Sequence, residues 1–223
     1  TPLVFSAAAS DRASGPVYLK LESLQRTGSF KVRGALNTVM SLTPEERGRG
    51  LICASSGNHG LGLAYAATRF GVRCIVVLPE HPNPLKRSLL KKLGADIVEF
   101  GINSDMQWEK VQQLSQDNSY TQVHPFSDPR IIAGQGTVGL EILEDLAEVD
   151  EVYVSIGGGG LISGIALAIR ELHPRAKVYG VEPEHSNAMA ESVRHQKLVV
   201  LPRVETIADG LAAKTTGHLN LAI

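Results

Sequence analysis

This sequence has few cysteines and no excess of either charge, and it has no long apolar run. It contains 2 cysteines in 223 residues, which is too few for a disulfide framework, and they do not form a CxxC site. Lys and Arg total 22 against 23 Asp and Glu, so no basic excess is available to hold a nucleic-acid backbone. The longest apolar runs, such as residues 74–78, are far shorter than the roughly 20 residues of a membrane-spanning helix. We therefore expect neither nucleic acid nor membrane as a partner.

The overall composition is that of a globular protein. Apolar residues make up 43% of the chain and charged residues 20%, which argues against long disordered segments. The length of 223 residues corresponds to one or two domains. The first residues, TPLVF, lack a basic stretch followed by an apolar one, so we expect no signal peptide and a cytoplasmic location.

Short β-branched runs alternate with amphipathic stretches along the whole chain. This alternation predicts right-handed βαβ units and an α/β fold whose mostly parallel sheet is covered by helices on both faces. The predicted strands span residues 17–22, 51–54, 74–78, 97–100, 152–156 and 178–182. The predicted helices span residues 30–38, 60–70, 84–93, 105–116, 136–147 and 161–172, with a further helix starting at Thr43-Pro44.

Each of three polar or glycine-rich stretches follows a predicted strand and precedes a predicted helix. They are Thr27–Gly34, Ala54–Gly60 and Ser155–Gly160. Ligands of open α/β sheets collect at the carboxyl ends of the strands, so we expect the three stretches to line one crevice.

The third stretch contains four consecutive glycines, Gly157, Gly158, Gly159 and Gly160. Such a loop turns backbone N–H groups toward a ligand, and the helix that follows adds its positive N-terminal end, so the pattern favours phosphate binding over a tight turn without a ligand. It lacks the GxGxxG dinucleotide pattern and the Gly-Lys-Ser/Thr of a P-loop, which argues against a nicotinamide oxidoreductase.

The other two stretches offer an amine and an anion-binding turn. Lys31 lies in the first turn of a predicted helix, where the helix dipole disfavours a cation and lowers the pKa of an amine, although a solvated lysine is the more common reading of this segment alone. Residues 55–60 (SSGNHG) suit a carboxylate or simply cap a helix, and His59 reads more readily as a structural hydrogen-bonding residue than as a base. Together, the three stretches offer a phosphate site at residues 157–160, an amine at Lys31 and a carboxylate site at residues 55–60. This combination suits pyridoxal phosphate and an amino-acid substrate.

Five segments occur in a recognisable order: residues 19–35 (LKLESLQRTGSFKVRGA), 55–60 (SSGNHG), 133–137 (AGQGT), 157–160 (GGGG) and 206–210 (TIADG). Together they resemble the serine/threonine dehydratase and serine racemase family of fold type II, tryptophan-synthase-β-like pyridoxal phosphate enzymes. The resemblance implies two three-layer αβα lobes. Residues 46–127 would form a smaller substrate-binding lobe, and residues 1–45 and 128–223 would form part of a larger cofactor-binding lobe. It also implies a homodimer or tetramer.

The resemblance assigns a role to each matching residue. Lys31 would carry the cofactor as a Schiff base and then act as the base at the substrate Cα, and Ser56 would handle the proton on the opposite face in racemising members. The cofactor-binding set would be Phe30, Lys31, Asn58, Gly157, Gly158, Gly159, Gly160 and Leu161. The substrate-binding set would be Ser55, Ser56, Gly57, Asn58 and His59. Members usually continue beyond Ile223 and there supply a partner to the pyridine nitrogen, for which we identify no residue here.

The resemblance implies a pyridoxal 5'-phosphate-dependent dehydratase, or ammonia-lyase, acting on L-threonine or L-serine. Serine racemase, alone or as a second activity, and a catalytically inactive ligand-binding homologue are the alternatives. Many relatives bind Mg²⁺, Ca²⁺ or K⁺ near a Val-Glu-Pro segment, where Glu182 matches the first ligand and no second carboxylate is evident.

Two further expectations concern cysteines and lysines outside these motifs. Cys53 and Cys74 have apolar neighbours, so we expect both to be buried, reduced packing residues. Lys86, Lys91 and Lys92 are expected on the polar face of the 84–93 helix.

Overall fold

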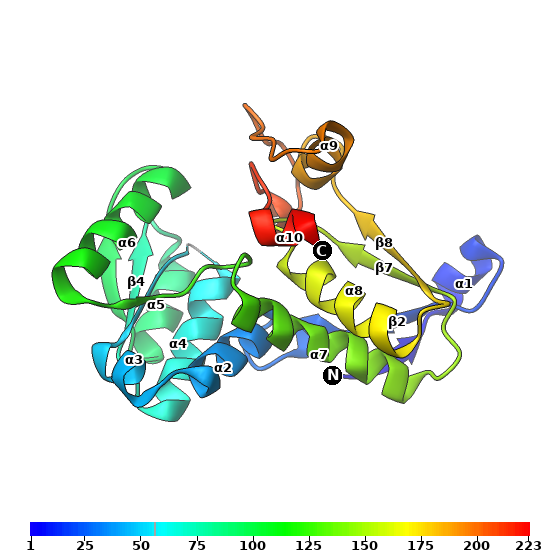
Figure 1. The fold of residues 1–223 in the computed structure, drawn as a ribbon, viewed down its shortest axis with the longest axis horizontal. Helices are drawn as coiled ribbons and strands as arrows, with labels where there is room; N and C mark the ends of the chain where they lie inside the picture. Colours follow the sequence, from blue (N-terminus) through cyan, green and yellow to red (C-terminus); the bar gives the residue numbers. More distant parts are fainter. Residues whose placement is uncertain (56) are drawn as a thin grey trace.

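The computed structural model describes residues 1–55 and 57–223 and has an α/β architecture. Helices and strands alternate through most of the chain, as the sequence predicts (Figure 1). The strands are β1 (Leu3–Phe5), β2 (Tyr18–Lys20), β3 (Leu51–Ala54), β4 (Cys74–Leu78), β5 (Asp96–Glu99), β6 (Thr121–Gln122), β7 (Glu151–Ser155) and β8 (Lys177–Val181). The α-helices are α1 (Ala7–Ala13), α2 (Lys31–Ser41), α3 (Pro44–Arg49), α4 (Asn58–Phe70), α5 (Pro84–Lys92), α6 (Ser104–Asn118), α7 (Pro129–Asp145), α8 (Gly160–Leu172), α9 (Ala188–His195) and α10 (His218–Ala222), and η1 (Glu22–Leu24) and η2 (Asp209–Leu211) are 3₁₀ turns.

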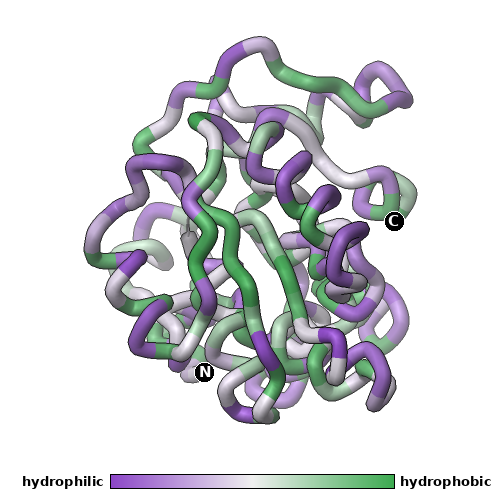
Figure 2. The backbone as a smooth tube through the Cα atoms, turned by 90° about the vertical axis from the view of Figure 1, so that its left-hand side faces the viewer, coloured by the Kyte–Doolittle hydropathy of each residue, from purple (hydrophilic) through white to green (hydrophobic). Residues whose placement is uncertain are grey.

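The main sheet is parallel and has the strand order β5-β4-β3-β6. Its central strand β4 is buried on both faces, because Cys74, Val76 and Leu78 pack toward α2, α4 and α5 while Ile75 and Val77 pack toward α6. Each such Val, Ile or Leu contributes roughly 1.5–3 kcal/mol by leaving water. Figure 2 shows these hydrophobic strands running through the middle of the sheet, with more hydrophilic segments around them.

Two smaller sheets complete the fold. β7 and β8 pair in parallel, and β1 and β2 pair antiparallel. The inner side of β7 packs on α7 and α8 through an apolar cluster that includes Val152, Val154, Ile165 and Ile169. The mostly parallel sheets agree with the expected fold class, whereas the division of the chain into lobes at residues 46 and 127 stays a prediction.

Helix α7 runs along the base of the molecule and packs against both α2 and α8 (Figure 1). The prediction that it begins at residue 136 is wrong by about two turns, because Pro129 occupies its first turn and the Asp128 side chain accepts a hydrogen bond from the Arg130 N–H at 2.7 Å. Glycine is required where α7 crosses α2: a Cβ on Gly134 would lie 2.5 Å from the Gly34 Cα. The helices therefore meet backbone to backbone.

Among the described residues, no helix combines the length and apolar character needed to cross a membrane. Both cysteines are buried free thiols on β3 and β4, as expected. Burial raises the pKa of Cys74 to about 12 and raises the pKa of Cys53 well above its usual value.

Candidate active site

Lys31 is the first residue of α2, and its side chain is partly buried. The Nζ atom donates a hydrogen bond to the Pro125 carbonyl oxygen at 2.7 Å and lies 5.3 Å from the centroid of the Phe30 ring. Burial lowers the pKa of Lys31 to about 8, since no carboxylate among the described residues pairs with the amine to offset the loss of water. At pH 7 roughly a tenth of the amine is therefore uncharged, far more than for an ordinary lysine, and the uncharged form is the one that a nucleophile or proton acceptor requires.

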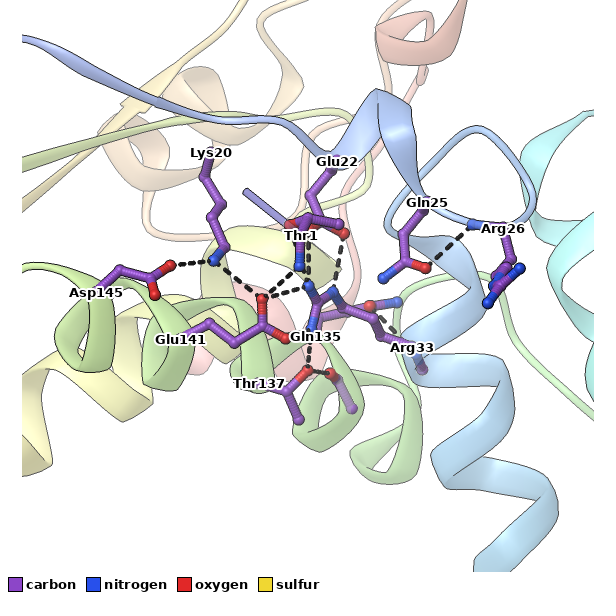
Figure 3. Close-up of polar contacts among 12 residues, drawn as sticks. Thr1, Lys20, Glu22, Gln25, Arg26, Arg33, Gln135, Thr137, Glu141 and Asp145 are labelled. Carbon is purple, nitrogen blue, oxygen red and sulfur yellow. Dashed lines mark hydrogen bonds and ion pairs between the residues drawn. The ribbon is translucent and has the colours of Figure 1, made fainter. Parts of the chain in front are cut away.

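Arg33 anchors the same turn of α2 to the rest of the molecule (Figure 3). Its guanidinium donates to both carboxylate oxygens of Glu22 at 2.8 Å and to both of Glu141, on α7, at 2.6 and 2.8 Å. The Arg33 side chain is 8% exposed, so these charge-assisted bonds form largely out of water. Lys20 also pairs with Glu141, at 3.0 Å. This network, which we call the Arg33 network, fixes where α2 begins and hence where Lys31 stands.

The Gly157–Gly160 loop lies between β7 and α8 and presents unpaired backbone donors. Within the part of the chain that the structure describes, the N–H groups of residues 157–162 make no hydrogen bond. Gly159 has φ +95°, which favours glycine, and a Cβ on Gly158 would lie 2.2 Å from the Phe126 ring. A row of free amides at the N-terminus of an apolar helix is a ready anion-binding site, as the four glycines predict.

The 55–60 stretch leads into α4, and its described residues differ in their hydrogen bonds. The Ser55 hydroxyl accepts hydrogen bonds from the Gly57 and Gly60 N–H groups at 3.2 and 3.0 Å, so it caps the helix. The side chain of Asn58 is exposed, and its N–H and that of His59 have no acceptor among residues 1–55 and 57–223. Ser56, expected to be catalytic, lies outside the described residues.

The His59 side chain is buried, and its one hydrogen bond among the described residues goes to the backbone. Its Nε2–H donates to the Val123 carbonyl oxygen at 3.2 Å, while its Nδ1 has no hydrogen-bond partner among the described residues. Burial and the neighbouring Lys31 charge lower the pKa of His59 to about 3, so the ring is neutral at physiological pH. A neutral imidazole held on a carbonyl agrees with the structural hydrogen-bonding role favoured from the sequence.

One short segment, residues 123–126, touches all three predicted stretches. Val123 accepts from His59, Pro125 accepts from Lys31, and Phe126 packs against Gly158 and Gly160. The three stretches therefore meet around a single backbone segment, which supports the expectation that they line one crevice.

The sequence reasoning missed this 123–126 segment. His124 packs edge-on between Trp108 and Phe126, with ring centroids 5.2 and 4.5 Å away. Its Nδ1 accepts from the Ser127 N–H at 2.9 Å, and burial lowers the pKa of His124 to about 4. The only available indication was the position of the segment after a strand, and β6 has just two residues and no apolar alternation.

Two other expected site residues serve the fold. The side chain of Leu161 packs on the β7–α8 core, so only its backbone N–H faces the glycine loop. The Glu182 carboxylate accepts from the Met189 and Ala190 N–H groups at 2.9 and 2.8 Å and so binds the start of α9. Over the described residues, no group of three or more His, Cys, Asp or Glu side chains is arranged to hold a metal ion. Cation binding at Glu182 stays an untested expectation.

Comparison with known proteins agrees with a site that could hold pyridoxal phosphate. Residues 1–223 match the family model described as pyridoxal-phosphate dependent enzyme. The chain is 43% identical over 223 residues to an L-threonine ammonia-lyase of Thermotoga maritima and 40% identical over 214 residues to the catabolic L-threonine dehydratase of Escherichia coli. It spans 56% and 65% of the length of these two curated relatives.

Solved structures of similar proteins match the fold over the full length of this chain. A threonine deaminase isoform from Solanum lycopersicum superposes with a TM-score of 0.96 at 37% identity, and the match covers 100% of this chain and 61% of that one. Maize serine racemase superposes with a TM-score of 0.94 at 33% identity, covering 100% of this chain and 69% of that one. The expected fold type II architecture is thereby confirmed.

Proposed function

This chain belongs to the family of pyridoxal-phosphate dependent enzymes, and on that premise we propose that it converts L-threonine, L-serine or both to the corresponding 2-oxo acid and ammonia. The meeting of Lys31, the 55–60 turn and the glycine loop around residues 123–126 carries this proposal. The named activities of the threonine ammonia-lyase and dehydratase relatives support it.

The residues present fit pyridoxal phosphate. Free amides at Gly157–Gly160 offer donors for a phosphate, and a Cβ on Gly158, Gly159 or Gly160 would collide with neighbouring atoms at 2.2–3.0 Å, so the loop needs its glycines. The Lys31 amine, with a pKa of about 8, lies beside the Phe30 ring and forms no ion pair with any described carboxylate. We propose that Lys31 attaches the cofactor, that Phe30 borders its ring and that Asn58 hydrogen-bonds its 3-hydroxyl.

When bound, pyridoxal phosphate withdraws electrons from the substrate Cα and so acidifies the Cα–H bond. The chain supplies the rest of the chemistry. The Asn58 and His59 amides hold the substrate carboxylate at the start of α4, which fixes the amino acid in one orientation. Lys31 then takes the Cα proton, a task suited to a base whose pKa lies near the working pH.

Loss of the β-hydroxyl with a proton releases water, and hydrolysis of the resulting enamine releases ammonia and the 2-oxo acid. His59 is neutral and bound to the Val123 carbonyl, so it adds no charge that would compete with the substrate carboxylate. His124 and Trp108 are half-buried and pack edge-on against each other, so their rings limit the access of water from that side.

The test measures 2-oxo acid formed from L-threonine and L-serine by the protein loaded with pyridoxal phosphate. Lys31→Ala should abolish turnover and the cofactor's covalent attachment, detected by borohydride reduction and peptide mapping. The matched control Lys92→Ala, on the exposed side of α5, should behave as the unmodified protein. Borohydride-fixed cofactor on another lysine would overturn the site assignment.

Serine racemase is the second candidate, favoured by the similarity to the maize enzyme. Chiral chromatography of serine incubated with the protein detects racemisation directly. If the protein racemises serine, Ser56→Ala should abolish that activity while elimination from the L-isomer survives. Equal loss of both activities would contradict separate roles for Ser56 and Lys31.

The proposal extends to the organisation of the protein. Residues 46–127 would carry the substrate turn as a smaller lobe, and the flanking segments would carry the glycine loop. The working assembly would be a homodimer or tetramer acting on a small amino acid, in the cytoplasm. Light scattering on the purified protein measures the assembly.

A further inference from the structure

The amine of Lys86 lies beside the 55–60 turn, although the sequence pattern assigns it to the polar surface of α5. Its Nζ is 3.6 Å from the position that a Cβ on Gly57 would occupy. The side chain is 33% exposed, so it lies over protein rather than extending into solvent. The long lysine stem thus carries a positive charge from α5 to the turn where the substrate carboxylate is proposed to bind.

The neighbouring charges leave this amine available. Arg87, the next residue, is turned away and pairs with Glu99 at 2.5 Å. Lys86 itself is 3.7 Å from the Asp209 carboxylate, and the Asp209 side chain is 92% exposed. An ion pair this long and this exposed is worth little, so an arriving carboxylate can compete with Asp209 for the amine.

The turn also offers backbone donors directed at the same anion. The Asn58 and His59 N–H groups have no acceptor in the described part of the chain, and they open a helix of 13 residues. Lys86 adds a full charge to these partial ones. A carboxylate held by two amides and an ammonium gains charge-assisted hydrogen bonds that the amides alone do not provide.

We infer that Lys86 is a binding residue for the substrate α-carboxylate and discriminates amino acids from their uncharged derivatives. This inference rests on the proposed function, because it takes the 55–60 turn as the carboxylate site. Asp209 is the weak partner of the Lys86 amine in the free enzyme, and the substrate carboxylate replaces it on binding. Lys86 contributes to substrate affinity and not to proton transfer at Cα, which belongs to Lys31.

The experiment compares L-alanine with L-alaninamide, which differ in the carboxylate and cannot eliminate a β-substituent. Binding to the protein loaded with pyridoxal phosphate is followed by the cofactor's absorbance, so the titration works whether or not threonine is a substrate. Lys86→Met should weaken L-alanine binding about 10-fold, the effect of one charge-assisted hydrogen bond, and leave L-alaninamide binding unchanged. Lys86→Arg should restore most of the loss.

Kinetics and a matched control complete the test. With L-threonine, Lys86→Met should raise KM about 10-fold at constant kcat, because a uniform binding interaction is removed. Lys92→Met, the same change elsewhere on α5, should alter neither constant. Asp209→Asn should leave L-alanine binding equal or tighter. Equal loss of both ligands in Lys86→Met, or matching losses in Lys86→Met and Asp209→Asn, would overturn the inference and assign Lys86 to a structural contact with η2.

If the unmodified protein binds L-alanine but forms no product from L-threonine or L-serine, the proposed function fails. The Lys86 inference is then decided by how Lys86→Met changes the ratio of L-alanine affinity to L-alaninamide affinity. If it turns over L-threonine and Lys86→Met leaves the preference for alanine over alaninamide unchanged, the Lys86 inference fails alone.

Discussion

Replacing Arg33 by Met removes a buried cation and leaves its two carboxylate partners in place. Methionine fills much of the volume of the arginine stem, so the change acts chiefly on charge and hydrogen bonding. Glu22 is 14% exposed and loses its cationic partner among the described residues. Glu141 is 32% exposed and keeps Lys20 at 3.0 Å. The substitution therefore leaves Glu22 with an uncompensated charge, whereas the charge of Glu141 stays partly compensated.

The expected loss of stability is about 3 kcal/mol. Breaking a buried ion pair by removing one partner costs roughly 3–5 kcal/mol, because the remaining charge is left without compensation. We take the lower end of that range, because only Glu22 loses its cationic partner in a largely buried position. Glu141 is partly solvated and keeps its ion pair with Lys20. Because the Arg33 network fixes the start of α2, the same change should also weaken cofactor attachment at Lys31.

Urea unfolding at neutral pH, followed by far-UV circular dichroism, measures the free energy of unfolding. The double variant Arg33→Met with Glu22→Gln should recover at least about 1 kcal/mol, since a neutral amide is less costly to bury than an unpaired carboxylate. A loss below about 1 kcal/mol in Arg33→Met would refute the reasoning and place this network among ion pairs that contribute little.

The pH dependence gives an independent check of the Arg33 network. The hydrogen bonds from Arg33 hold the pKa of Glu141 well below its usual range in the folded state. A depressed folded-state pKa contributes stability that is present above the unfolded value, near 4.5, and is lost as the pH falls through the folded-state value. As the pH decreases below about 4.5, the free energy of unfolding should therefore decrease. Arg33→Met should make the free energy of unfolding depend less on pH in this range.

Three further predictions address the site and the core. Because burial lowers the pKa of Lys31 to about 8, the rate at which pyridoxal phosphate attaches to the apoprotein should reach half its maximum near pH 8. Stopped-flow absorbance measures this rate. A midpoint near the ordinary lysine value of 10.5 would contradict the effect of burial. Gly158→Ala should weaken cofactor affinity at least about 10-fold in equilibrium dialysis, since its Cβ would lie 2.2 Å from the Phe126 ring; unchanged affinity would mean that the loop yields freely. Cys53 and Cys74 should resist a maleimide at pH 7 until urea unfolds the protein, and rapid labelling of the folded protein would show that the β3–β4 core is open.

The sequence predicts the elements whose formation depends on local pattern. The strands at residues 51–54 and 74–78 have the bounds that apolar runs and flanking turns indicate. Helix α3 also starts at Thr43-Pro44 as expected, and the structure adds a capping box in which Thr43 and Glu46 satisfy each other's backbone N–H groups. The four consecutive glycines could be singled out from their own pattern, whereas Lys31 could be singled out only by its combination with the glycines and the 55–60 turn and by the family resemblance.

The remainder depends on contacts that no local pattern contains. Gly134 and Gly136 interrupt a helical pattern in the sequence, yet both lie inside α7, because Gly134 faces Gly34 of α2 and Gly136 faces Gly164 of α8 with little room for a side chain. Residues 123–126 become central only because α2, α4 and the glycine loop fold around them. Lys86 follows the polar periodicity of α5, and periodicity gives no information about where the end of a long side chain reaches.

The edge-on contact of Trp108 with His124 gives this protein its own optical probe. The sequence contains a single tryptophan, and its ring centroid lies 5.2 Å from that of His124, one residue before the carbonyl that accepts from Lys31. Indole emission from this chain therefore comes from one place, at the wall of the crevice. Pyridoxal phosphate absorbs where indole emits, so quenching reports loading without any label, and later additions of amino acid can be followed in the same cuvette.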